Sequence, residues 1–142
     1  MSANLYVETS ALIRVVLEGD ETLRPLLLGE GRYTSALTFA EAARAILRAQ
    51  REGRLDARGV REAKKRVAEF GRACEIVPVA ESILDRAGQE FPAEPVRTLD
   101  AIHLATVFVL NAVAVDLDVV SCDRRVRENA DALGFAFHPA TS

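Results

Sequence analysis

The sequence predicts an α/β protein with a small central parallel sheet flanked by helices. Short apolar runs typical of strands alternate with segments whose apolar residues recur at helical spacing. This alternation is typical of parallel strands joined by crossover helices. A chain of 142 residues suits one domain, and a domain of that size buries roughly 70% of its unfolded-chain surface. We therefore predict a single domain over residues 1–142, with a loose tail at 139–142.

The first quarter of the chain predicts two strands and two helices. The apolar run Leu5-Tyr6-Val7 within residues 4–8 predicts a buried strand. Residues 10–18 and 20–29 carry apolar side chains at helical spacing, and a pair of glycines ends the second helix. Residues 32–36 are short and extended.

Two long helices and a strand are predicted next. The segment TFAEAARAILRAQREG, residues 38–53, is a helix that ends at a glycine, and residues 56–73 form a charged helix with one face in solvent. The segment EIVPV, residues 75–79, predicts a strand near the edge of the sheet, because Pro78 has no N–H to donate to a neighbouring strand.

The remaining segments alternate in the same way. Residues 98–113 are apolar nearly all round, which predicts a buried helix. The preceding residues 91–97 carry two prolines and predict a loop. The other elements expected here are helices over 80–90 and 124–133 and strands over 118–122 and 135–137.

Composition and charge exclude several classes of protein. No window approaches the ~18 consecutive apolar residues of a membrane span, and no basic region precedes a long apolar run at the N-terminus, so we expect a cytoplasmic protein without membrane contact. Cys74 and Cys122 form no motif, which indicates reduced thiols and no zinc site. The net charge of −3 argues weakly against a nucleic-acid partner. All but two of the 18 basic residues are arginines, which suit phosphate better than lysines do, although a GC-rich genome is the favoured explanation of this excess.

Four acids stand at comparable places in this predicted fold. Glu8 ends the first strand, Glu41 and Asp100 lie in the first turns of helices, and Asp123 directly follows a strand. Sites in α/β proteins gather outside the carboxyl ends of the strands, so the four acids are expected to meet there. Carboxylates that meet repel one another unless cations are present, and hard ions such as Mg²⁺ or Mn²⁺ prefer oxygen ligands. The pattern predicts metal-dependent hydrolysis of phosphodiesters.

Each acid taken alone also has a structural explanation. The spacing of Thr38 and Glu41 is that of a capping box, and Asp123 can be an N-cap. The helix dipole favours Asp100 near its helix N-terminus. Glu8 fits such an explanation least, because the serine two residues later is a better cap.

Four segments of the chain form a recognisable set: YVETSALI, TSALTFAEAARAI, RTLDAIHLATV and VVSCDRRVRENADALGF. In this order and spacing they resemble the PIN-domain ribonucleases, and most of all the VapC toxins of VapBC toxin–antitoxin pairs. The likeness spans about residues 4–139. It implies a small parallel sheet wrapped by helices, Mg²⁺ or Mn²⁺ as cofactor and RNA as substrate. It also implies inhibition by a cognate VapB-like antitoxin, and a homodimer.

The resemblance also assigns residues to the site. The catalytic acids that it implies are Glu8, Glu41, Asp100 and Asp123, and the metal ligands among them are Glu8, Asp100 and Asp123. The family has Asp where this chain has Glu8, and a displacement of about 1 Å can cost on the order of 10²-fold in rate. Three outcomes are open: metal binding with a shifted backbone or rotamer, a slow enzyme, or a binding module for RNA or antitoxin that has lost catalysis. We favour the first, because bridging waters allow such shifts.

Hydroxyl groups near the acids are expected to support them. The candidates are Thr9, Ser10 and Ser121, which could hydrogen-bond the acids or a phosphate. Capping the first helix is an equally good role for the first two. His103, three residues after Asp100, is interpreted as a satisfied core histidine rather than a general base.

Several arginines are candidates for binding the RNA backbone. They are Arg14 on the first helix, Arg124, Arg125 and Arg127 after the last acid, and Arg44 and Arg48 one turn apart. We expect at least one of these groups to border the acidic cleft. Solvated helix faces are the alternative.

Other readings concern an apolar segment and a competing chemistry. The segment LRPLLLGE, residues 23–30, either packs in the core or forms a groove for an apolar segment of the antitoxin.

A phosphatase with a nucleophilic aspartate would need an Asp-x-Asp pair after a strand. The only such pair, Asp116 and Asp118, comes before one, which argues against that reaction.

Overall fold

A parallel sheet organises the part of the chain that the computed structural model describes, residues 4–113 and 115–140. Its strand order is β3-β2-β1-β4-β5, and every neighbouring pair is parallel. The strands are β1 Asn4–Val7, β2 Arg32–Ser35, β3 Glu75–Val77, β4 Leu117–Val120 and β5 Phe137–His138. The edge position predicted from Pro78 is confirmed, because β3 is the outermost strand on its side.

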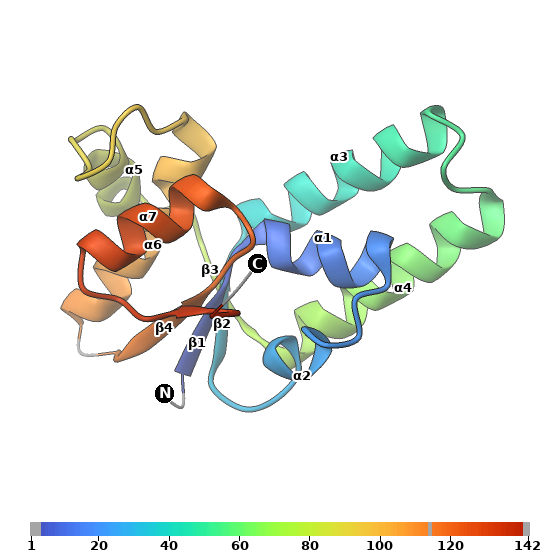
Figure 1. Ribbon diagram of the computed structural model, residues 1–142, viewed down its shortest axis with the longest axis horizontal. Helices are drawn as coiled ribbons and strands as arrows, with labels where there is room; N and C mark the ends of the chain where they lie inside the picture. The colour runs from blue at the N-terminus through green and yellow to red at the C-terminus, as the bar shows by residue number, and fades with distance from the viewer. Residues whose placement is uncertain (1–3, 114, 141–142) are drawn as a thin grey trace.

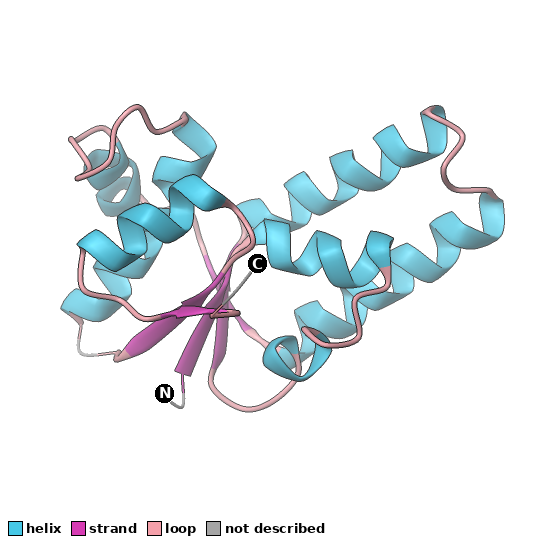
Figure 2. Cartoon of the chain, in the orientation of Figure 1, coloured by secondary structure: helices cyan, strands magenta, loops and turns pink. Residues whose placement is uncertain are grey.

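Two groups of helices cover the sheet, one on each face (Figure 1). The first group is α1 Thr9–Glu18, α2 Arg24–Leu27, α3 Leu37–Arg51 and α4 Ala57–Ala73. The second group is α5 Glu81–Ala87, α6 Thr98–Ala112 and α7 Arg124–Ala132. Figure 2 shows the strands as one layer between the two groups. The predicted α/β class with a small parallel sheet is confirmed.

Alternation along β1 divides the core into two parts. Tyr6 packs in a cluster with residues of α5, α6 and α7, including Ile83 and Leu104. Leu5 and Val7 face the other way and pack with residues of α1, α2 and α4. Successive side chains of a strand point to opposite faces, so a central strand that is apolar at every position must be covered on both.

Helices α3 and α4 form an antiparallel pair that extends away from the sheet (Figure 1). Asp56 caps α4, since its side chain accepts a hydrogen bond from Gly59 N at 2.7 Å. The far part of the pair has a small core of its own around Ile46, Val60 and Ala63. One face of α4 stays in solvent, as its charge pattern predicts.

Several predicted boundaries were wrong. The helix predicted over residues 20–29 is only α2, because Asp20 forms a turn with Thr22 instead. The strand predicted over 118–122 ends at Val120, which leaves its last two residues beyond the sheet. Helix α6 is buried over its first part but not all round, and Phe108 near its end is 41% exposed.

The C-terminal segment returns to the sheet. The last strand begins two residues later than predicted and ends one residue later, and its His138 pairs with Val120. The carbonyl of Pro139, in the expected loose tail, accepts a hydrogen bond from Arg127 Nη2 at 2.6 Å. Residues 141–142 of that tail lie outside the described residues. In the described ranges, no helix is both long enough and apolar enough to span a membrane.

Candidate active site

The centre of the sheet brings two chain segments together. Val7 of β1 pairs with Val120 of β4, and the N–H of Glu8 donates to the carbonyl of Val120 at 2.9 Å. The strands are parallel, so the residues that follow both of them emerge at the same edge. Glu8 and Ser121 therefore become neighbours although they lie 113 positions apart in the chain.

Glu8 is buried and held by three hydrogen bonds. Its Oε1 accepts from the hydroxyls of Ser10 and Ser121, each at 2.5 Å, and its Oε2 accepts from Ser10 N at 3.0 Å. The side chain is thus the N-cap of α1. The prediction that Ser10 would be the better cap was wrong. The extra methylene of glutamate lets the carboxylate turn back onto the first turn of its own helix.

Glu41 contacts a histidine and a threonine from other segments. Its Oε1 lies 2.6 Å from His103 Nε2 and accepts from the Thr9 hydroxyl at 2.7 Å. Burial raises the pKa of Glu41, but the contact with His103 and the Thr9 hydroxyl outweigh it, so the pKa lies below its ordinary value. The capping-box interpretation was wrong, because α3 begins after Ala36 without a side-chain cap.

His103 is a core residue, as interpreted from the sequence, and it also reaches the acids. It is 1% exposed, and its Nδ1 lies 2.7 Å from the hydroxyl of Tyr6. Both ring nitrogens therefore have partners, with Tyr6 on one side and Glu41 and Thr9 on the other. The imidazole of His103 thus connects the buried hydroxyl of Tyr6 on β1 to the carboxylate of Glu41.

Asp100 and Asp123 lie at the entrance of the site. Asp123 is the N-cap of α7, since its Oδ1 accepts from Val126 N at 3.0 Å, which confirms the capping interpretation. Burial, followed by the charges of Asp123 and Glu8, raises the pKa of Asp100 from 3.8 to about 6. The charges of Asp123 and Glu8 thus add to the effect of burial on Asp100, as expected for acids that share a site.

All four acids line one cleft of about 510 Å³ at this edge of the sheet. Asp100 and Asp123 also line a second cleft of about 510 Å³ on their other side. The four acids expected to meet at the carboxyl ends of the strands do lie around one cleft. Within residues 4–113 and 115–140, however, no three Asp, Glu, His or Cys side chains are arranged as ligands of one metal ion.

The predicted hydroxyls all contact acids or neighbours of acids. Thr9 donates to Glu41, Ser10 and Ser121 donate to Glu8, and Ser121 Oγ also accepts from Asp123 N at 3.0 Å. Ser121 thus joins two of the acids. This arrangement leaves no buried side-chain polar atom without a partner among the described residues.

The predicted arginines divide into two sets. Arg44 and Arg48 line the first cleft and Arg125 lines the second, so the expectation that one group borders the acids is confirmed. Arg14 and Arg124 line neither cleft. Each of these two instead pairs with a glutamate on its own helix, at 3.4 Å and 3.3 Å. Arg127 also lines neither cleft, and it donates to the carbonyls of Ser121 and Pro139.

A protein-family model described as the PIN domain matches residues 5–132. The chain belongs to the PIN-domain family. The match covers every element from β1 to α7, and the sequence resemblance to this family is confirmed.

Two ribonucleases of Mycobacterium tuberculosis are similar to this PIN domain over nearly their whole length. Ribonuclease VapC46 of strain ATCC 25618 / H37Rv is 33% identical over 138 residues, which are 94% of this chain and 95% of that protein. Ribonuclease VapC35 of strain CDC 1551 / Oshkosh is 37% identical over 137 residues, 93% of each chain.

Solved structures share the fold at lower identity. A toxin–antitoxin complex from Klebsiella pneumoniae has a TM-score of 0.66 at 15% identity, with 98% of this chain and 100% of that chain covered. VapBC2 from Rickettsia felis, bound to a DNA fragment from its promoter, has a TM-score of 0.66 at 10% identity, covering 94% and 96%. PAE2754 from Pyrobaculum aerophilum has a TM-score of 0.62 at 18% identity, covering 94% and 82%.

Sequence reasoning missed two residues of this PIN-domain site. Arg97 lines the second cleft together with Arg125, and nothing in the loop FPAEPVR indicated that it would face the acids. Asn129 is buried in α7 and holds that loop, because its Oδ1 accepts from Ala93 N at 2.8 Å and its Nδ2 donates to Ala93 O at 3.1 Å. A buried asparagine in a charged helix was the available signal.

Proposed function

We propose that this PIN domain is a metal-dependent endoribonuclease and the toxin of a toxin–antitoxin pair. The observation that carries the proposal is the meeting of Glu8, Glu41, Asp100 and Asp123, from four segments of the chain, around one cleft. The similarity to two ribonucleases over at least 93% of the chain supports it.

The residues of the cleft fit a hard divalent cation. Their donors are carboxylate oxygens, which Mg²⁺ and Mn²⁺ prefer. Burial, followed by the charges of Asp123 and Glu8, raises the pKa of Asp100, and a cation nearby would favour its ionised form. Asp100 and Asp123 would hold the ion, and Glu8 would join them by turning away from Ser121. When bound, the cation supplies positive charge against the phosphate and lowers the pKa of water in the cleft.

Glu41 is placed to orient that water. Its Oε1 is occupied by His103 and Thr9, and no described residue hydrogen-bonds its Oε2. The lowered pKa keeps the carboxylate ionised at neutral pH, so Oε2 can accept a hydrogen bond from a water molecule. Because both partners of Oε1 are buried, the direction of Oε2 is fixed before substrate arrives.

The hydrogen bonds of Glu8 favour a second candidate function. A carboxylate that already caps α1 and accepts from Ser121 has little need of a cation. On this reading, the chain is a catalytically weakened PIN domain that binds RNA or antitoxin.

Cleavage of RNA decides between the two functions. We expect Mn²⁺-dependent cleavage by the native chain, and its loss in Asp100→Asn, together with loss of growth arrest on expression. The matched control is Asp131→Asn, an exposed acid on α7 that lines neither cleft. Comparison with Glu8→Asp completes the test. A native chain that is inert beside an active Glu8→Asp variant would reject the first function and leave the binding module.

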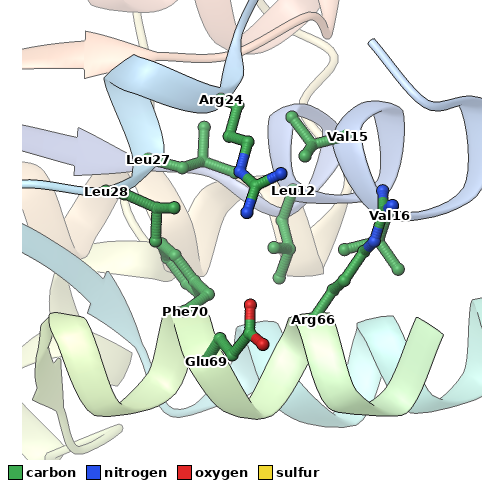
Figure 3. A pocket seen from close by; sticks show the side chains of 9 residues that line it. All are labelled: Leu12, Val15, Val16, Arg24, Leu27, Leu28, Arg66, Glu69 and Phe70. Atoms are coloured by element: carbon green, nitrogen blue, oxygen red, sulfur yellow. The ribbon is translucent and has the colours of Figure 1, made fainter. Parts of the chain in front are cut away.

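We also propose that an apolar segment of a VapB-like antitoxin binds near α2. Figure 3 shows Leu12, Leu27, Leu28 and Phe70 around a small pocket with charged residues at its rim. The pocket holds only about 20 Å³, so docking would start from the exposed Leu28 and open it. Leu23 and Leu27 pack in the core, which is the structural reading of this segment.

Mutation of Leu28 tests this binding site. We expect Leu28→Asp to weaken binding of the protein encoded beside this gene while metal-dependent cleavage stays unchanged. Leu84→Asp, at an exposed leucine on α5, is the control. Equal effects of both variants would argue against the α2 site.

We also propose that the chain forms a homodimer. Light scattering would measure the mass of the particle in solution directly.

A further inference from the structure

Three hollows of the surface share lining residues one with the next, and together they are called the track here. The second cleft shares Asp100 and Asp123 with the first cleft. The first cleft in turn shares Arg44 and Arg48 with a third hollow of about 310 Å³ along α3. The third hollow is completed by Leu47, Arg51 and Glu52. A path therefore runs from the loop before α6, past the acids, and out along α3.

Most arginines of this track have no ion pair within the described residues, and several arginines outside it, such as Arg58 and Arg61, have none either. No ion pair is recorded within the described residues for Arg44, Arg48, Arg51 or Arg97. Arg125 has only a contact of 4.0 Å with Glu128. By contrast, Arg14, Arg24, Arg54, Arg66 and Arg124, which lie outside the track, each pair with a glutamate. The track thus keeps most of its guanidinium groups available to a ligand.

The three arginines of α3 form a row. Residues 44, 48 and 51 are four and three positions apart, which places them on one side of a helix. The opposite side of α3 carries the buried Ala42, Ile46 and Ala49. At 1.5 Å per residue the row extends about 10 Å along the helix axis. Since α3 extends away from the sheet, the row leads away from the acids (Figure 1).

We propose that Arg44, Arg48 and Arg51 bind successive backbone phosphates on one side of the cleaved bond of an RNA strand, and that Arg97 and Arg125 bind phosphates on the other side. The proposal rests on the proposed function and adds the path of the substrate. Guanidinium groups fit phosphate oxygens by two parallel hydrogen bonds and read no base sequence. Phosphate contacts on both sides of the acids select an internal phosphodiester bond rather than a chain end.

The lining of the third hollow favours a polyanion over a protein segment. Its only apolar residue is Leu47, and its single acid, Glu52, pairs with Arg54 at 2.8 Å. A docking site for a protein segment would need a larger apolar centre.

Binding of a fluorescent single-stranded RNA, measured in EDTA over a series of salt concentrations, tests the track. We expect Arg44→Gln, Arg48→Gln and Arg51→Gln each to weaken binding several-fold and to reduce the slope of log K against log salt by about 0.7 per lost contact. Arg58→Gln and Arg61→Gln are the matched controls, because they remove exposed arginines of α4 that line none of the three hollows. Equal losses in controls and track variants, or unchanged slopes in all of them, would overturn the proposal.

Shortening the RNA from either end tests the two-sided arrangement. In the α3 variants, nucleotides at one end of the RNA should no longer contribute to binding affinity. In Arg97→Gln and Arg125→Gln, nucleotides at the other end should no longer contribute to it. Sensitivity of both sets to the same end would contradict it. These measurements need no cleavage, so a chain that binds RNA in this manner without cutting it would reject the proposed enzyme and keep the track. If the native chain cuts RNA and the arginine variants bind RNA as tightly as it does, the proposed enzyme is kept and the track is rejected.

Discussion

The Nε2 atom of His103 lies 2.6 Å from Oε1 of Glu41, although 62 positions separate the two residues in the chain. The histidine is nearly inaccessible to solvent and also contacts the hydroxyl of Tyr6. A buried imidazole held at both nitrogens has a fixed ring orientation. It thereby fixes the position of an acid at the cleft from inside the core.

The first prediction concerns the hydroxyl of Tyr6. We expect Tyr6→Phe to lower the free energy of unfolding by about 1–2 kcal/mol, because His103 Nδ1 then lacks a partner in the core. Urea denaturation would measure the loss. Tyr33→Phe is the control, since no hydrogen bond of the Tyr33 hydroxyl is recorded among the described residues and its environment is only partly buried. A loss of similar size in both variants would show that the contact with His103 contributes nothing specific.

The second prediction concerns Asp100 and pH in the absence of metal. Its pKa in the folded chain, about 6, lies above the ordinary 3.8, so folding disfavours the ionised form. This group therefore makes the protein more stable as pH falls from above 6 to below 3.8. We expect Asp100→Asn to raise stability at pH 7 by about 1 kcal/mol and to remove this contribution.

Thermal denaturation of the native chain and of Asp100→Asn in EDTA across pH 4–7 would measure the difference in their stability. Subtracting one chain from the other isolates the contribution of Asp100 from those of the other titrating groups. A variant that is less stable than the native chain at pH 7 would mean that burial of the ionised Asp100 and its repulsion by Asp123 and Glu8 do not destabilise the fold.

The third prediction concerns metal and stability. We expect Mg²⁺ or Mn²⁺ to raise the melting temperature of the native chain, since a ligand at 100 times its Kd adds about 2.7 kcal/mol to folding. Asp123→Asn should lose most of this effect, whereas Asp131→Asn on the same helix should retain it. Differential scanning fluorimetry with and without EDTA would follow the shift. An equal shift in the native chain and Asp123→Asn would place the binding of metal elsewhere.

The fourth prediction concerns Asn129, which joins α7 to the loop before α6. Asn129→Ala leaves the N–H and the carbonyl of Ala93 without their partner, and we expect a loss of about 2 kcal/mol in unfolding free energy. Asn111→Ala, in the exposed last turn of α6, should cost much less. Hydrogen exchange of the Ala93 amide would report directly on the loop. Unchanged protection of that amide in Asn129→Ala would contradict the role of the side chain.

The sequence by itself determined the succession of strands and helices along the chain. It also determined that the acids lie outside the carboxyl ends of the strands. Apolar runs and helical spacing follow from burial, which acts locally on each segment, so β1, α3, α4 and α6 could be predicted to within a few residues. The convergence of Glu8 and Asp123 followed from the geometry of parallel strands, whereas no strand directly precedes the helix that carries Asp100.

Only the tertiary structure decided which partner each acid has. Glu8 bonds to Ser121 across 113 positions, and Glu41 bonds to His103 rather than to its own helix N-terminus. Such contacts depend on side-chain rotamers and on distances of a few tenths of an ångström between distant segments, which local patterns do not encode. For the same reason, local patterns do not predict that Arg97 lines the second cleft or that Asn129 hydrogen-bonds to Ala93. Both depend on how the loop before α6 packs against α7.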